Sequence, residues 1–182
     1  DFEVRSPFFM EEPVPRLAFR DPIFGRCLVR VTDRFQDKSS VDSSGGLKNE
    51  YSRVQSFNAD ETRFLIRGTS GSWYLYNAQT LQPLGQLPIE LDPRWSATDP
   101  DLIYFSQETR LMVVDINTRQ VSLVHEFAAD FPGQELVMVW SKYEGSPSRD
   151  GRYWGFMAED ADWNPVAFLG YDLQTDRVIA RR

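Results

Sequence analysis

Three short stretches of the sequence place charged or amide side chains beside an aromatic ring. Pockets for sugars and peptides combine these groups, because the apolar lining supplies affinity and a few polar groups fix the orientation of the ligand. We therefore take these stretches as candidates for ligand binding. Their residues are Glu50, Tyr51, Arg53 and Gln55 in the first, Asp92, Arg94 and Trp95 in the second, and Tyr143, Glu144 and Ser146 in the third.

A loop rich in carboxylates offers a second kind of chemistry. Glu159, Asp160 and Asp162, with Asn164 beside them, carry the hard oxygen ligands that Ca²⁺ prefers. Their spacing does not match an EF-hand loop, and Ca²⁺ takes six or more oxygens. Two interpretations therefore stay open, a weak calcium site and a solvated hairpin loop, and we favour the loop.

The rest of the sequence contains no recognisable catalytic set. The only histidine, His125, has no second histidine or cysteine at ligand spacing, and metal sites need several ligands. There is no Gly-x-Ser-x-Gly, no glycine-rich phosphate loop and no His-Glu-x-x-His. Serines without a nearby base are poor nucleophiles. We expect no catalytic residue and no cofactor in this chain, with Ca²⁺ or Mn²⁺ as weak alternatives.

Composition favours a sheet protein that does not bind nucleic acid. Aromatic residues make up 14% of the 182 residues, and aromatic side chains suit the half-buried surface of a sheet. The net charge of −7 excludes a polyanion partner, which needs clustered Lys and Arg. No stretch approaches the roughly 20 apolar residues of a membrane helix. The chain begins at Asp1 rather than Met, so we expect a processed or excised chain, for which an extracellular or periplasmic location is open.

The single cysteine, Cys27, lies in the apolar run of residues 27–29. One cysteine cannot form a disulfide within the chain. Free cysteine is among the most buried residue types, so we expect Cys27 to be a small buried hydrophobe rather than a reactive or intermolecular thiol.

A four-residue polar pattern occurs three times: Asn or Asp, an apolar residue, Asn or Gln, and Thr. Asn and Asp tolerate the backbone angles of turns, and their side chains accept hydrogen bonds from backbone amides just ahead. Each copy lies between two strand-like runs and therefore predicts a β-hairpin. The copies are residues 77–80, 115–118 and 172–175, with flanking strands at 73–76 and 81–87, 111–114 and 120–127, and 167–171 and 177–180.

An Asp-centred turn precedes each hairpin and joins a short strand to an apolar strand. Asp150-Gly151 is the strongest of these turns, because Asp-Gly suits the tight turn of a β-hairpin. Turn and hairpin together predict four antiparallel strands per unit. The turns lie at residues 57–64, 95–102 and 146–153, and the apolar strands that follow lie at 64–66, 102–105 and 153–157.

The spacing of the units predicts part of a β-propeller, an all-β fold. From Asn77 to Asp115 is a step of 38 residues, close to the length of a propeller blade, about 40–45 residues. From Asp115 to Asp172 is a step of 57, so the third unit carries an insertion, which we place mainly at residues 128–143. We expect about three to four four-stranded antiparallel blades, too few to close a ring. The divisions are 1–49 (N-terminal strands at 26–32, an exposed loop at 35–48 and a partial blade), 50–89, 90–127 and 128–182.

The turn sequences resemble those of a known propeller family. Residues 146–152, Ser-Pro-Ser-Arg-Asp-Gly-Arg, look like the Ser-Pro-Asp-Gly turn of TolB-type propeller repeats, with two residues inserted after the proline. Residues 57–60 and 95–101 resemble degenerate copies, so the resemblance covers about residues 50–182. The oligogalacturonate lyase group is distantly similar. This likeness implies an extracellular carbohydrate substrate and a histidine-rich manganese centre, for which this chain has only His125.

In a propeller the innermost strand of each blade lines the central tunnel, so the three candidate stretches would lie on the tunnel face. We expect a binding module within a larger propeller that recognises a glycan or a protein there. The alternative function is an extracellular polysaccharide lyase or hydrolase whose catalytic residues lie in other blades. The structural alternative is that these polar groups line a wet tunnel while Trp95 packs between blades. The expected partners are remaining blades, a second copy or another chain that completes the ring.

Overall fold

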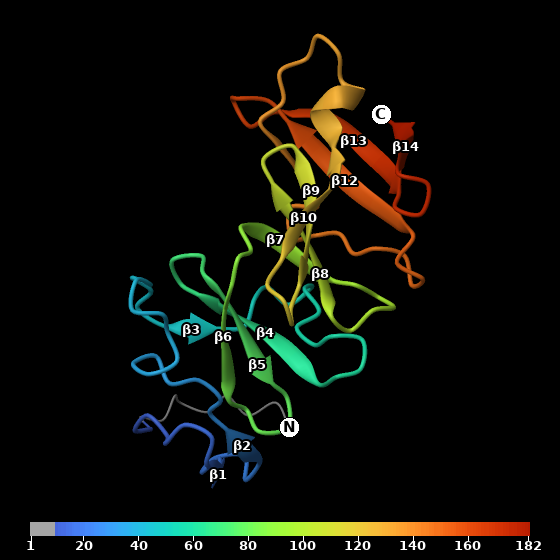
Figure 1. Ribbon diagram of the computed structural model, residues 1–182. Coiled ribbons are helices and arrows are strands. Elements are labelled where there is room, and N and C mark those ends of the chain that lie inside the picture. The colour runs from blue at the N-terminus through green and yellow to red at the C-terminus, as the bar shows by residue number, and fades with distance from the viewer. Residues whose placement is uncertain (1–9) are drawn as a thin grey trace.

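A computed structural model describes residues 10–182, which form three four-stranded antiparallel sheets and one two-stranded hairpin. In each large sheet the strands follow chain order, and the three sheets succeed one another along the molecule like blades of an open propeller (Figure 1). The first blade is β3 (Leu47–Lys48), β4 (Arg63–Gly68), β5 (Trp73–Asn77) and β6 (Pro83–Leu87); the second is β7 (Leu91–Trp95), β8 (Leu102–Gln107), β9 (Arg110–Asp115) and β10 (Val121–Glu126); the third is β11 (Met138–Trp140), β12 (Tyr153–Glu159), β13 (Pro165–Asp172) and β14 (Arg177–Arg181).

The three predicted hairpins are confirmed, and side-chain hydrogen bonds hold their turns. In the first hairpin the Asn77 side chain accepts hydrogen bonds from the backbone N–H groups of Gln79 and Thr80, both at 2.9 Å. Asp115 and Asp172 accept the equivalent pairs of bonds in the other two hairpins. The polar pattern thus fixes each turn by its own chemistry, as expected for Asx turns.

Two apolar cores join the blades and a third lies outside the first blade. The core between the first and second blades contains Leu65, Trp73 and Ile103, and the core between the second and third contains Phe127 and Trp154. The third is a smaller cluster on the opposite face of the first blade, made by Phe64, Ile66, Tyr74 and Tyr76 with Val31, Leu47, Ala78 and Leu81 packed against it.

The insertion expected at residues 128–143 is only partly an insertion. It contains β11, which is the innermost strand of the third blade, besides most of the 3₁₀ turn η1 (Phe127–Asp130). The backbone N–H of Val139 also donates to the carbonyl of Glu108 in the second blade, at 2.9 Å. No helix within residues 10–182 is long and apolar enough to cross a membrane.

The expectation of a buried Cys27 is wrong, because Cys27 is exposed. It lies in β2 (Cys27–Val29), which pairs with β1 (Ala18–Arg20), and every residue of β2 is exposed. In the part of the chain that the structure describes, no further strand extends this pair, and a two-stranded hairpin alone has too little sheet to form a core of its own.

The loop that was expected to be exposed, residues 35–48, instead covers the outer face of the first blade in part. The hydroxyl of Tyr74 donates to the Asp42 carboxylate at 2.5 Å, and the hydroxyl of Tyr76 donates to Asp37 at 2.9 Å. Gly68 allows the close approach, because a Cβ there would lie 2.4 Å from the Ser44 hydroxyl oxygen. Buried tyrosine hydroxyls need partners, and these two aspartates supply them.

The lowered pKa of Asp42 predicts that acid weakens the attachment of the loop 35–48 to the first blade. Burial by itself would raise its pKa, but hydrogen bonds from Tyr74, Ser44 and Ser70 hold the pKa well below its ordinary value. A lowered folded-state pKa stabilises the fold above the unfolded pKa of about 3.9, and this stabilisation is lost as the pH falls through the folded value. In urea unfolding, the difference between the wild type and Asp42→Asn should be constant above about pH 5 and shrink below about pH 4. A difference independent of pH from 7 to 3 would contradict this.

Candidate ligand site on the innermost strands

The innermost strand is irregular at a similar place in all three blades. In the first blade β3 ends at Lys48, and the chain rejoins β4 only through the bridge between Phe57 and Phe64. In the third, β11 ends at residue 140, and the next bond to β12 runs from the Ser148 N–H to the Tyr153 carbonyl. In the second, the register of β7 shifts between residues 91 and 94. These interruptions present the loops 49–56 and 141–147 and the bulge at 92–93.

The bulge and the third loop meet at a buried carboxylate. Asp92 is 4% exposed, has a backbone φ of 55° and accepts hydrogen bonds at 2.7 Å from both the backbone N–H and the hydroxyl of Ser141. The N–H of Tyr143 donates to its other oxygen at 3.2 Å. Asp92 of the second blade therefore fixes the start of the loop 141–147 of the third blade.

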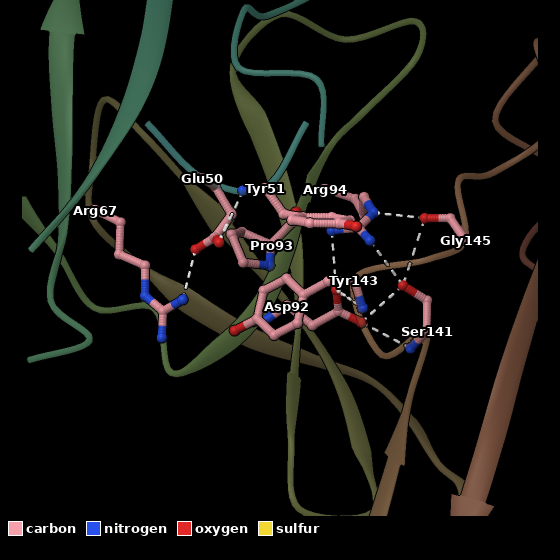
Figure 2. A network of polar contacts seen from close by, with 9 residues as sticks. All are labelled: Glu50, Tyr51, Arg67, Asp92, Pro93, Arg94, Ser141, Tyr143 and Gly145. Carbon is pink, nitrogen blue, oxygen red and sulfur yellow. Dashed lines mark hydrogen bonds and ion pairs between the residues drawn. The ribbon is translucent and has the colours of Figure 1, made fainter. Parts of the chain in front are cut away.

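Arg94 completes this buried network (Figure 2). Its guanidinium lies 2.9 Å from Asp92 and donates to the Gly145 carbonyl at 2.8 Å and to the Ser141 hydroxyl at 2.9 Å. Burial raises the pKa of the Asp92 carboxyl, and Arg94 together with the hydrogen bonds from Ser141 and Tyr143 offsets only part of that rise. All this places Arg94 as a structural clamp between two blades rather than as an exposed ligand contact.

A second ion pair links the first blade to the same place. Arg67 of β4 donates to Glu50 at 2.8 Å (Figure 2). Its guanidinium lies 5.7 Å from the ring of Trp73 and 5.8 Å from that of Tyr143. The Nε of Arg67 is buried and has no hydrogen-bond partner among residues 10–182. Buried donors are rarely left without an acceptor, and ordered water usually supplies one where the protein does not.

The exposed rim of the site contains Tyr51, with 52% of its surface exposed, and the ion pair between Arg53 and Glu144. This pair joins the loop of the first blade to the loop of the third, across the second. Both partners are more than half exposed. The rim thus combines a free aromatic face with two opposite charges in contact with solvent.

The exposed ion pair between Arg53 and Glu144 should contribute little to the stability of the fold. Exposed ion pairs are worth about 0–1 kcal/mol, because water and salt screen them and two long side chains must be ordered. We expect Arg53→Ala to lower the free energy of unfolding by less than about 1 kcal/mol in urea titrations. Glu144→Ala serves as the matched partner variant. A loss above about 2 kcal/mol for either would show a structural role instead.

A groove of about 360 Å³ adjoins this rim and runs past the Asp-centred turns of all three blades. Its walls contain the exposed ring of Phe57, the amide of Gln55 and the exposed guanidinium of Arg149. Trp95 also lines it, but Trp95 is buried, and its indole N–H donates to the Ser56 carbonyl at 2.8 Å.

The structure brings together all three predicted stretches, although with different roles. Tyr51, Arg53, Gln55 and Glu144 are exposed, whereas Arg94 and Trp95 are buried. Glu50 and Tyr143 are half-buried, and the Tyr143 hydroxyl lies 3.3 Å from the Asp92 N–H, which donates to it. Sequence reasoning missed Arg67 and Ser141. Arg67 had one weak signal, as a charged residue within the apolar strand 63–68, and Ser141 had none.

The structure does not bring the calcium candidates together. The fully buried Glu159 accepts hydrogen bonds from the Trp140 indole and the Lys142 ammonium, both at 2.6 Å. Asp160 accepts hydrogen bonds from the backbone N–H groups of Asp162 and Asn164 at 3.0 and 2.9 Å. Within residues 10–182, no three His, Cys, Asp or Glu side chains are grouped so that they could hold a metal ion.

His125 lies away from these loops, on the outermost strand β10 of the second blade. Its two ring nitrogens lie 2.7 Å from Asp130 and 2.6 Å from Asp176, and the hydroxyl of Tyr171 donates to Asp176 at 2.7 Å. His125 thus joins the second blade to the third, and both of its ring nitrogens already have a carboxylate partner.

Comparisons with known proteins identify the fold. No protein-family model and no curated protein matches the chain. Among solved structures, it is similar to an oligogalacturonate lyase from Vibrio parahaemolyticus, with a TM-score of 0.58 and 18% identity over 91% of this chain and 46% of that one. It is also similar to an oligogalacturonate lyase in complex with manganese, with a TM-score of 0.58 and 18% identity over 93% of this chain and 48% of that one.

This likeness supports a partial propeller of the predicted all-β class, and at this identity it shows the fold alone. The chain spans slightly less than half the length of these two structures. Manganese in one of them raises the question of whether the present residues fit a metal. Within residues 10–182 they do not, since the one histidine is held by Asp130 and Asp176 and no ligand group is formed.

Proposed function

We propose that this chain is the binding part of a larger propeller and recognises a glycan on its tunnel face. The observation that carries the proposal is that the irregular stretches of three successive innermost strands meet at one place. They bring an exposed aromatic ring and an exposed ion pair into one region, beside the buried ion pair of Asp92 and Arg94. Ligand sites typically combine aromatic surface with a few polar groups in this way.

The chemistry of the site suits a sugar better than an apolar ligand. Tyr51 offers a flat aromatic face, and Arg53, Gln55 and Glu144 offer donors and acceptors around it. A buried network behind the rim holds the loop 141–147 in place before any ligand arrives, which lowers the entropic cost of binding. A protein ligand would use the same rim, and it is the alternative occupant.

The structural neighbours favour a glycan and supply a second candidate function. Both are named as lyases of an oligogalacturonate, which is a sugar oligomer. If this chain belongs to a lyase or hydrolase, the catalytic residues and the metal would lie in blades beyond residues 10–182. Those blades could come from the same chain, a second copy or another chain.

A glycan array combined with a cleavage assay separates these functions. The array should contain neutral and uronic-acid oligomers, and the assay should follow product formation with and without Mn²⁺ or Ca²⁺. Binding of a glycan without cleavage supports the binding module. Metal-dependent cleavage by this chain alone would overturn it, and absence of any glycan binding by the folded chain would leave the protein ligand as the better account.

A further inference from the structure

The imidazole of His125 lies between two carboxylates that come from different blades. Its Nδ1 lies 2.6 Å from Oδ1 of Asp176, in the turn between β13 and β14 of the third blade. Its Nε2 lies 2.7 Å from Oδ2 of Asp130, in η1 at the end of the second blade. The fully buried rings of Phe127 and Tyr171 pack on the imidazole, with centroids 4.6 and 5.0 Å away. This packing holds the orientation of the ring, and only 14% of the side chain is exposed.

The Asp176 carboxylate requires a donor at Nδ1. The hydroxyl of Tyr171 donates to the same oxygen at 2.7 Å. This bond, followed by the contact with His125, holds the pKa of Asp176 below its ordinary value, although burial opposes the shift. Burial and the bond to Asp176 raise the pKa of Tyr171, so this hydroxyl keeps its proton and stays the donor. An ionised carboxylate only accepts hydrogen bonds, so the ring nitrogen that faces Asp176 carries a proton.

The second ring nitrogen meets the same requirement. A neutral imidazole has one N–H donor, and its other nitrogen is an acceptor. If Nδ1 donates to Asp176, a neutral ring directs the lone pair of Nε2 at an Asp130 oxygen 2.7 Å away. Imidazolium donates from both nitrogens, and a carboxylate at this distance favours the charged form of the ring.

Other charged groups beside this cluster already have partners. Glu126, the next residue on β10, is paired with Arg110 at 2.9 Å. Arg181 of β14 donates to Gln134 at 2.6 Å and to the backbone carbonyl, not the carboxylate, of Asp130 at 3.5 Å. A proton on the imidazole therefore supplies the positive charge that the two carboxylates of the cluster lack.

We propose that His125, Asp130 and Asp176 form a proton-dependent latch between the second and third blades, closed while the imidazole carries both protons and loosened when it loses one. Histidine is the side chain whose charge ordinarily changes between pH 5 and 8. A proton held more tightly in the folded chain than in the unfolded chain stabilises the fold below about pH 6.5, where free histidine titrates. This stabilisation is lost as the pH rises through the value at which the folded chain releases the proton.

NMR of the imidazole tests the protonation state, and the single histidine of the chain gives one set of signals. With ¹⁵N in the ring, most wild-type molecules should carry both ring protons at pH 7.5, where about a tenth of free histidine side chains do. Asp176→Asn and Asp130→Asn should each lower this fraction by about twofold or more. Asp162→Asn, which changes an exposed aspartate of the third blade, should leave it unchanged. A neutral wild-type ring at pH 7.5, or equal protonation in either of the first two variants, would overturn the proposal.

Urea unfolding tests whether this proton holds the blades together. His125→Gln keeps a donor and an acceptor but does not titrate. The difference in urea midpoint between the wild type and His125→Gln should be largest near pH 5.5 and shrink as the pH rises to 9. Leu123→Gln, at an exposed position of the same strand, should give a difference that does not change with pH. A difference for His125→Gln that is equally independent of pH would show a packing role alone and contradict the latch. Neither measurement depends on glycan binding.

Discussion

Replacing Asp92 by alanine should lower the free energy of unfolding by about 3–5 kcal/mol, because it leaves the buried guanidinium of Arg94 without its counter-charge. Asp92 and Arg94 are each 4% exposed, so water cannot replace the lost carboxylate. The same substitution removes the acceptor for the N–H and hydroxyl of Ser141, which anchor the third blade to the second. Domains of this size are stable by about 5–15 kcal/mol, so the loss would be a large fraction of the total.

Urea unfolding of two companion variants tests the cause. Asp92→Asn keeps an acceptor and a residue type that tolerates the positive φ of 55°, so it should cost less than Asp92→Ala. Asp162→Ala removes an exposed aspartate and should change stability by no more than about 0.5 kcal/mol. If Asp92→Ala cost as little as Asp162→Ala, the Asp92 network would not be the clamp between the blades.

Replacing Trp154 by alanine should cost a similar amount, about 3–5 kcal/mol, through loss of packing rather than charge. Trp154 is buried in the core between the second and third blades, with its ring centroid 5.4 Å from that of Tyr104 and 5.7 Å from that of Phe156. Its indole N–H also donates to the Gly151 carbonyl at 2.8 Å, which holds the Asp-Gly turn against the sheet.

Trp163→Ala is the matched control, since Trp163 is 56% exposed in the loop between β12 and β13. It removes the same side chain with a much smaller loss of buried surface, so we expect a change below about 1 kcal/mol. Equal losses for the two tryptophans would contradict a continuous core between the blades. Unfolding monitored by circular dichroism avoids the change in fluorescence that either substitution causes.

The hairpins could be predicted from sequence because their chemistry is local. Asn77, Asp115 and Asp172 bond to amides two and three residues ahead, so the turn is encoded within four residues. The innermost strands were less predictable. β3 and β11 are short and separated by loops from the turns that follow them, so no alternating pattern marks them.

The site was only half predictable, for a related reason. The exposed residues Tyr51, Arg53 and Glu144 were found because aromatic and charged residues occur together in the sequence. That Arg94 would be buried could not be read from the sequence, since its burial depends on Ser141 and Gly145, about fifty residues further along the chain. The division of the chain at residues 50, 90 and 128 and the ligand role of these residues stay predictions.

That the loop 35–48 covers the outer face of the first blade was not predicted, because its polar sequence was taken to mean that it is exposed. Asp37 and Asp42 lie in a Ser- and Gly-rich segment that is typical of an exposed loop. They are bound by the hydroxyls of Tyr74 and Tyr76, whose orientation toward the outer face depends on the pairing of β5 with β4. Long-range acceptors of this kind leave no local pattern.

The central claim is that the innermost-strand loops form a glycan site, and calorimetric titration of the chain with the glycan selected by the array tests it most directly. The account predicts saturable binding that Tyr51→Ala weakens by about tenfold or more, equivalent to about 1.4 kcal/mol, while Phe35→Ala, which removes an exposed ring from the N-terminal segment, leaves the affinity unchanged. A folded wild type whose affinity for that glycan is the same in Tyr51→Ala would contradict the account.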